Sequence, residues 1–130
     1  MKLEHLDHVA ITVSDLDRSM QWYRDVLGLE RRFQDAWGDE PPIMMCAGDT
    51  CVALFPPSGR PNPVPGADTL AMRHFAFVTN RARWNQARAE LKERGIEASF
   101  SDHGVSQSVY LMDPDGHTIE LTTYELSDGD

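Results

Sequence analysis

Apolar and polar positions along the chain repeat one pattern twice. Residues 8–30 read HVAITVSDLDRSMQWYRDVLGLE, and residues 74–97 read HFAFVTNRARWNQARAELKERGIE. Each segment opens with a histidine on an apolar strand and continues through a polar break into an amphipathic helix. Each helix is expected to end at a glycine, Gly28 or Gly95, the residue type favoured just after a helix C-terminus. The sequence therefore predicts an internal duplication.

The rest of each copy has the pattern of β-strands. We predict strands near 29–36, 42–47 and 50–55 in the first copy, and near 96–101, 105–112 and 117–125 in the second. Ser14 or Asp15 can cap the first helix, and the second helix is expected at about 81–94. The predicted fold class is α+β: two βαβββ modules, at about 4–56 and 70–126, form a paired-sheet cleft in a single domain covering 1–130. The proline-rich segment 57–69 is the predicted linker.

Composition narrows the function classes. The chain has 130 residues, 41% of them apolar, and a formal net charge of -9. A nucleic acid would be repelled by this charge. No apolar run approaches the roughly 20 residues that cross a bilayer, and the first residues, MKLEH, lack the apolar stretch of a signal peptide. We therefore predict a cytoplasmic protein with neither a nucleic-acid nor a membrane partner.

The two cysteines, Cys46 and Cys51, flank a predicted two-residue hairpin turn at Gly48-Asp49. Such a turn places them opposite each other at a non-hydrogen-bonded pair, where side chains lie close together. A cross-strand disulfide is therefore geometrically conceivable. In a cytoplasmic chain, two reduced thiols are the expected state.

The candidate chemistry begins with the duplicated histidines. His8 and His74 hold the same place in their two copies, so pseudo-symmetry is expected to bring them together. Glu120 lies in the apolar-flanked strand segment TIELT, where a buried carboxylate without a partner would be costly. Two imidazoles and one carboxylate with open positions form a facial triad suited to Fe(II), and also to Mn(II) or Zn(II). We predict a metal site made of His8, His74 and Glu120.

The segments "LDHVAITVSDLDRSMQWYRDVLGLE", "RHFAFV" and "YLMDPDGHTIEL" resemble the vicinal oxygen chelate superfamily. That superfamily includes glyoxalase I, fosfomycin- and bleomycin-resistance proteins and extradiol dioxygenases. The resemblance implies metal ligands at His8, His74 and Glu120. Ala53 occupies the place of a fourth ligand, a departure from glyoxalase I and the related epimerases. Bleomycin-binding members usually lack the triad altogether.

The resemblance is closest to small members of the extradiol dioxygenase type. These enzymes have a histidine in a "DHG" turn and then a tyrosine before the ligand glutamate, which implies catalytic roles for His103 and Tyr110. The alternative is that His103 is a loop residue and that Tyr110 only packs. Many extradiol enzymes carry a further histidine on the last strand of the first module, whereas this chain has no histidine between His8 and His74. Fosfomycin-modifying proteins need several cations, and no lysine or arginine follows Glu120.

Together these features predict a metal-dependent enzyme that binds a small substrate through adjacent oxygens, most closely an extradiol dioxygenase using Fe(II) or Mn(II). Zn(II) and Ni(II) are further candidate metals. The alternative function is that of a glyoxalase-type lyase, isomerase or epimerase. A second alternative is a non-catalytic sequestering protein of the bleomycin-resistance type. We also expect a homodimer, because an open cleft exposes sheet edges and apolar surface.

Overall fold

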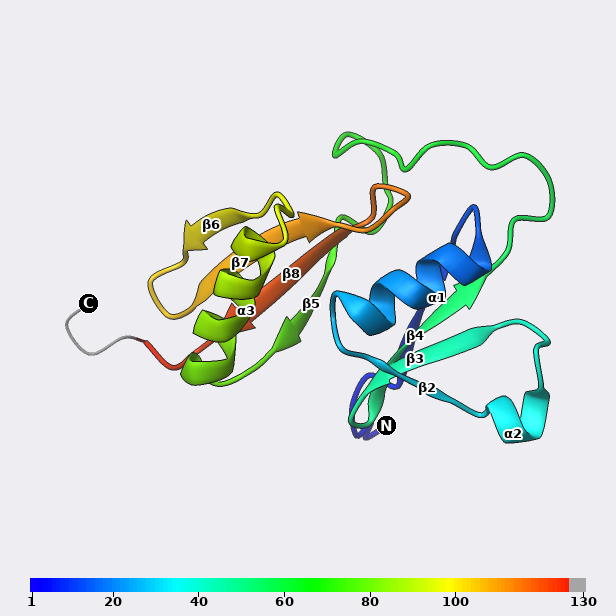
Figure 1. Ribbon diagram of the computed structural model, residues 1–130, viewed down its shortest axis with the longest axis horizontal. Helices are drawn as coiled ribbons and strands as arrows, with labels where there is room; N and C mark the ends of the chain where they lie inside the picture. Colours follow the sequence, from blue (N-terminus) through cyan, green and yellow to red (C-terminus); the bar gives the residue numbers. More distant parts are fainter. Residues whose placement is uncertain (127–130) are drawn as a thin grey trace. The chain divides into compact units, whose positions relative to one another are not determined.

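The computed structural model describes residues 1–126, and the chain divides into two compact units, Met1–Asn62 and Pro63–Asp130. Figure 1 shows that each unit combines a four-stranded sheet with a long helix. The predicted α+β class and the duplication of βαβββ are confirmed. The predicted linker, 57–69, forms neither helix nor strand and contains the boundary between the units.

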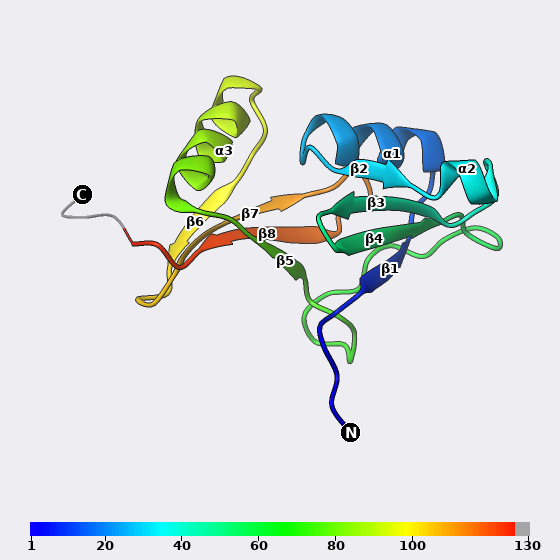
Figure 2. The same cartoon turned by 90° about the horizontal axis from the view of Figure 1, so that it is seen from below.

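The first unit contains four strands and two helices. Its elements are β1 (His8–Thr12), α1 (Leu16–Asp25), β2 (Glu30–Arg32), α2 (Gln34–Trp37), β3 (Ile43–Ala47) and β4 (Thr50–Phe55). The strand order is β1-β4-β3-β2, with β1 parallel to β4 and the other pairs antiparallel. The Asp15 carboxylate caps α1 by accepting a hydrogen bond from the backbone N–H of Arg18. The helix packs on β3 and β4. Figure 2 shows these strands below α1.

The second unit repeats this plan without the short helix. Its elements are β5 (Phe75–Val78), α3 (Arg81–Glu93), β6 (Ser99–Asp102), β7 (Gln107–Met112) and β8 (Thr118–Thr123). The strand order is β5-β8-β7-β6, with β5 parallel to β8. Helix α3 is fastened to β8 by the buried Trp84, whose indole N–H donates to the carbonyl of Leu121 at 2.9 Å. This hydrogen bond holds α3 to β8 at Leu121, the residue that follows Glu120.

Both predicted glycine stops are confirmed. Gly28 and Gly95 have positive φ angles of 69° and 68°, a backbone conformation that glycine adopts without steric cost. Their N–H groups bond back to the carbonyls of Arg24 and Lys92. Gly95 directly follows Arg94, the C-cap residue of α3, whereas Gly28 lies two residues after Val26, the C-cap residue of α1.

The predicted strand at 29–36 is wrong over its second half. Strand β2 ends at Arg32, and the next residue, Phe33, adopts a left-handed conformation with φ of 65°. A strand cannot continue through that conformation, and the chain turns into α2 instead. The aromatic rings of Phe33 and Trp37 then pack against each other, with centroids 5.0 Å apart.

The expectation of two reduced thiols is also wrong for this structure. Cys46 and Cys51 form a disulfide with their Cα atoms 4.0 Å apart. The hairpin is the predicted one, since Ala47 pairs with Thr50 across the two-residue turn and Cys46 pairs with Cys51. The disulfide therefore follows from the cross-strand pairing that the hairpin imposes on the two cysteines.

Within residues 1–126, every helix is too short and too polar to cross a bilayer.

Candidate metal centre

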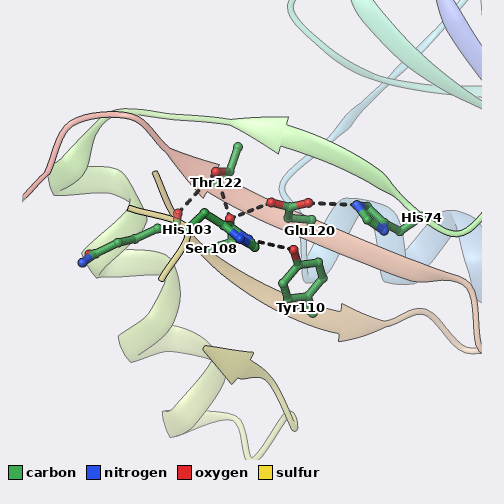
Figure 3. A network of polar contacts seen from close by, with 7 residues as sticks. His74, His103, Ser108, Tyr110, Glu120 and Thr122 are labelled. Atoms are coloured by element: carbon green, nitrogen blue, oxygen red, sulfur yellow. Dashed lines mark hydrogen bonds and ion pairs between the residues drawn. The ribbon is translucent and has the colours of Figure 1, made fainter. Parts of the chain in front are cut away.

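One face of the second unit carries the polar residues of the candidate site. Tyr110 pairs with Glu120 and Ser108 pairs with Thr122 across the β7–β8 ladder. Paired residues on neighbouring strands point to the same side of a sheet, as do residues two apart on one strand. The predicted alternation, with Tyr110, Ser108 and Glu120 on one face, is therefore confirmed. Helix α3 packs on β8 through Trp84. Figure 3 shows the polar residues from close by.

Glu120 contacts His74 directly. The Oε1 atom of Glu120 lies 2.9 Å from Nε2 of His74, and the side chains are 12% and 37% exposed. His74 immediately precedes β5, and β5 is the parallel neighbour of β8. Strand pairing within the second unit therefore brings together two of the three predicted ligands, although they are separated by 46 residues of sequence.

Ser108 holds the other oxygen of Glu120 and is itself in contact with Thr122, a feature that sequence reasoning missed. The fully buried hydroxyl of Ser108 donates to Oε2 of Glu120 at 2.6 Å, and its Oγ lies 2.9 Å from Oγ1 of Thr122 (Figure 3). Because Oε2 is occupied in this way, Oε1 is the oxygen that faces His74. Alternation placed Ser108 on the correct face, but it could not reveal that the serine orients the carboxylate.

His103 and Tyr110 form a second pair beside this contact. Nε2 of His103 lies 3.0 Å from the phenolic oxygen of Tyr110, and the Tyr110 ring packs edge-on against His74 with centroids 5.5 Å apart. Burial, and then the charge of Glu120 and a hydrogen bond to it, raise the pKa of Tyr110 above its ordinary value. The phenol is therefore protonated at neutral pH and can act as a donor.

His8, the third predicted ligand, is the first residue of β1 in the other unit. Its Nδ1 lies 2.7 Å from the Asp7 carboxylate, which leaves Nε2 free to bind a metal ion. His8 belongs to the first unit, and His74 and Glu120 belong to the second. Among residues 1–126, no three His, Cys, Asp or Glu side chains gather closely enough to hold a metal. The complete triad remains a prediction.

The strand register supports the assignment of Ala53 as the counterpart of Glu120. Ala10 pairs with Ala53 in the first unit, and Ala76 pairs with Glu120 in the second. Ala53 is buried beside Met44. The first unit thus contributes no carboxylate at this position.

The observed pair fits one corner of a metal site. Two ligand atoms at about 2.1 Å from one ion, at right angles to each other, lie about 3.0 Å apart. The separation of 2.9 Å between His74 Nε2 and Glu120 Oε1 matches that spacing. Imidazole nitrogen and carboxylate oxygen together suit Fe(II), Mn(II) and Zn(II). The separation and the donor types of this pair therefore match two ligands of a divalent ion.

The chain thus has two βαβββ units, and the second carries a His–Glu pair. These features are typical of one class of proteins. The solved structure of lactoylglutathione lyase from Agrobacterium tumefaciens has this fold, with a TM-score of 0.73 at 24% identity, over 95% of this chain and 96% of that one. The sequence model of the Glyoxalase/Bleomycin resistance protein/Dioxygenase superfamily matches residues 5–121. The chain belongs to this superfamily.

Two sequence relatives come from different reaction classes. Catechol-2,3-dioxygenase of Bacillus subtilis is 29% identical over 90% of this chain. Metallothiol transferase FosB of Staphylococcus epidermidis is 30% identical over 98% of this chain and 87% of its own length. The chain spans 40% of the length of the dioxygenase. The superfamily is therefore established, and the reaction is not.

The influence of Glu120 on the pKa of Tyr110 can be tested by a pH titration. Glu120→Gln removes the negative charge that opposes ionisation of the phenol, so the pKa of Tyr110 should fall toward its ordinary value. Ultraviolet difference spectroscopy of metal-free protein during a pH titration measures this, and Tyr110→Phe identifies the signal among the three tyrosines. An unchanged titration in Glu120→Gln would show that the carboxylate does not act on Tyr110.

Proposed function

We propose that the protein binds one divalent metal ion through His8, His74 and Glu120 and catalyses a reaction of the extradiol dioxygenase type on a small catechol-like substrate. The observation that carries this proposal is that two contacts, His74–Glu120 and His103–Tyr110, lie side by side because Tyr110 and Glu120 are cross-strand partners. His74 and Glu120 supply metal ligands, and His103 and Tyr110 supply proton chemistry beside them. The similarity to a catechol dioxygenase of Bacillus subtilis supports the choice of substrate class.

The chain's own residues divide the chemistry between them. Tyr110 is protonated at neutral pH and donates a hydrogen bond to a substrate oxygen. His103, in contact with the Tyr110 hydroxyl, accepts a proton from a substrate hydroxyl and later returns it. Ser108 keeps Glu120 in one orientation, so that the ligand oxygen does not have to be ordered when metal binds.

A divalent ion bound there supplies positive charge that holds two neighbouring substrate oxygens and stabilises negative charge developing on them. Fe(II) or Mn(II) is the favoured ion for an oxygen reaction. Zn(II) or Ni(II) fits the alternative without oxygen chemistry.

Tyr110 is one of the residues that line a pocket of about 430 Å³ in the second unit. Met112 and Ile96 contribute apolar surface, and among the described residues of its lining Glu97 alone is charged. A cavity of this kind suits the uncharged body of a catechol. It suits an anionic phosphonate poorly, because a carboxylate lines it where a cation would be needed. This favours a dioxygenase over a fosfomycin-modifying protein.

A lyase, isomerase or epimerase of the glyoxalase type is the second candidate. The observation that favours it is the lack of a histidine between His8 and His74, where many extradiol enzymes have an additional one. The same ligands could then stabilise an enolate without O2. Sequestration of a ligand without catalysis is the third candidate. A cytoplasmic location and a homodimer remain predictions from the sequence alone.

Metal binding tests the ligand set. We expect one Mn(II) or Fe(II) per chain by anaerobic calorimetry with elemental analysis, and loss of high-affinity binding in His8→Ala, His74→Ala and Glu120→Gln. His5→Ala is the matched control, since His5 lies three residues before His8 on an exposed segment, and it should bind like the wild type. Equal affinity in all four variants would contradict the proposed ligands.

The same titration separates the ligands from the residue that positions them. Ser108→Ala should still bind the metal, with an affinity roughly tenfold to a hundredfold lower, the range typical for loss of a hydrogen bond to a ligand. Thermal unfolding of the metal-free variants shows whether the loss comes from the fold. A variant with unchanged metal affinity would show that Ser108 does not orient Glu120.

Oxygen uptake tests the reaction. Protein reconstituted anaerobically with Fe(II) and mixed with a panel of catechols should consume O2 and form the yellow ring-opened product. His103→Ala should lower kcat strongly while retaining bound metal, because the proton acceptor is lost and the ligands remain. Metal-loaded protein that consumes no oxygen with any catechol would rule out the first candidate and leave the lyase or isomerase.

A further inference from the structure

Three potential metal ligands stand side by side across the sheet of the first unit. His8 on β1 pairs with Cys51 on β4, and Cys51 pairs with Cys46 on β3. The backbone N–H of Cys51 also donates to the carbonyl of Asp7 at 3.0 Å, which ties the β4 cysteine to the histidine strand. Residues paired in this way point to one face, on strands about 4.8 Å apart. An imidazole and two sulfur atoms therefore form one row.

This row belongs to the first unit alone. The second unit has Thr118 and Met112 paired with each other at the equivalent positions, beside His74. The duplication therefore preserved the histidine in both units, while the two cysteines occur only in the first. The metal triad proposed above uses His8 but neither cysteine.

The surroundings of the cysteines are apolar. Cys46 and Cys51 are 3% and 5% exposed and form a buried cluster with Met44 and Ala53. His8 lies at the edge of this cluster with its side chain 46% exposed and its Nδ1 held by Asp7. The sulfur pair shares its cluster with a thioether, Met44, and its sheet row with an imidazole, His8. These are ligand types that favour borderline or soft metals over Mg(II) or Ca(II).

We propose that reduction of the Cys46–Cys51 disulfide opens a second metal site, in which two thiolates and the His8 imidazole bind a borderline cation such as Zn(II). In the oxidised protein the sulfur atoms bond to each other and are not available as ligands. Reduction by a dithiol or a phosphine transfers two electrons and breaks the S–S bond, and each sulfur gains a proton. Metal binding then releases these two protons to solvent. Because both sites use His8, they compete for it.

Co(II) is the probe, because thiolate ligands give it an intense near-ultraviolet charge-transfer band that nitrogen and oxygen ligands do not. The protein is reduced with a phosphine, which becomes the phosphine oxide by taking oxygen from water, and is desalted anaerobically before Co(II) is added. We expect the band in reduced wild-type protein and none in oxidised protein. Only weak visible bands in the reduced protein would show that the thiols do not bind the metal and would overturn the proposal.

Variants separate the two sites. Cys51→Ser and Cys46→Ser should each lose about half or more of the charge-transfer intensity, and His8→Ala should weaken Co(II) binding by roughly tenfold or more. Glu120→Gln and His74→Ala should keep the band, since neither residue belongs to this row. Loss of the band in Glu120→Gln would overturn the proposal, because the thiolates would then depend on the other site.

The comparison between oxidised and reduced wild-type protein needs no substitution, so a cysteine variant that fails to fold leaves the test intact. Failure of this proposal is also distinct from failure of the proposed function. The latter is tested by Mn(II) or Fe(II) binding in oxidised protein, where the thiolates are absent.

Discussion

The carboxylate of Glu120 sets the main constraint on the second unit. It is largely buried on a central strand, where an unpaired charge would destabilise the fold by several kcal/mol or force the group to become neutral. Ser108 binds one oxygen and His74 contacts the other. The strand order β5-β8-β7 makes both contacts possible, because it places β8 between the strand that follows His74 and the strand that carries Ser108. The same order brings Tyr110 beside Glu120.

The two units have diverged at equivalent positions. Where the second unit pairs Tyr110 with Glu120, the first pairs Met44 with Ala53. One sheet face is thus polar, and the other is apolar and carries a disulfide. The histidine at the start of each copy is common to both. In the proposed site, the second unit supplies two metal ligands and the pair that handles protons, and the first unit supplies a single ligand.

Much of the fold followed from pattern alone. Strand β4 was predicted at its observed bounds, because the turn at Gly48-Asp49 fixes where it starts. The face shared by Tyr110 and Glu120 followed from alternation along β7 and β8. Two features could not be predicted in this way. The left-handed Phe33 ends β2 early without a glycine to mark it, and the bond from Ser108 to Glu120 depends on side-chain placement across two strands.

The candidate site also has a part that the sequence pattern predicts and a part that it does not. Strand pairing within the second unit accounts for His74 and Glu120, so local pattern and register were sufficient to bring them together. The role of His8 depends on pseudo-symmetry between the units, which strand patterns within either unit do not determine. The reaction depends on finer features still, such as which proton acceptor lies beside which substrate oxygen. Relatives in this superfamily include both a dioxygenase and a metallothiol transferase, so the fold does not select the chemistry.

We propose above all that the two units together build one metal site, with one histidine from each. X-ray absorption spectroscopy of the oxidised, Mn(II)-loaded protein tests it directly, because scattering from imidazole rings reports how many histidines bind the ion. We predict two imidazoles and a first shell completed by oxygen, with one imidazole left in His8→Ala. A wild-type spectrum with a single imidazole, unchanged in His8→Ala, would contradict the claim.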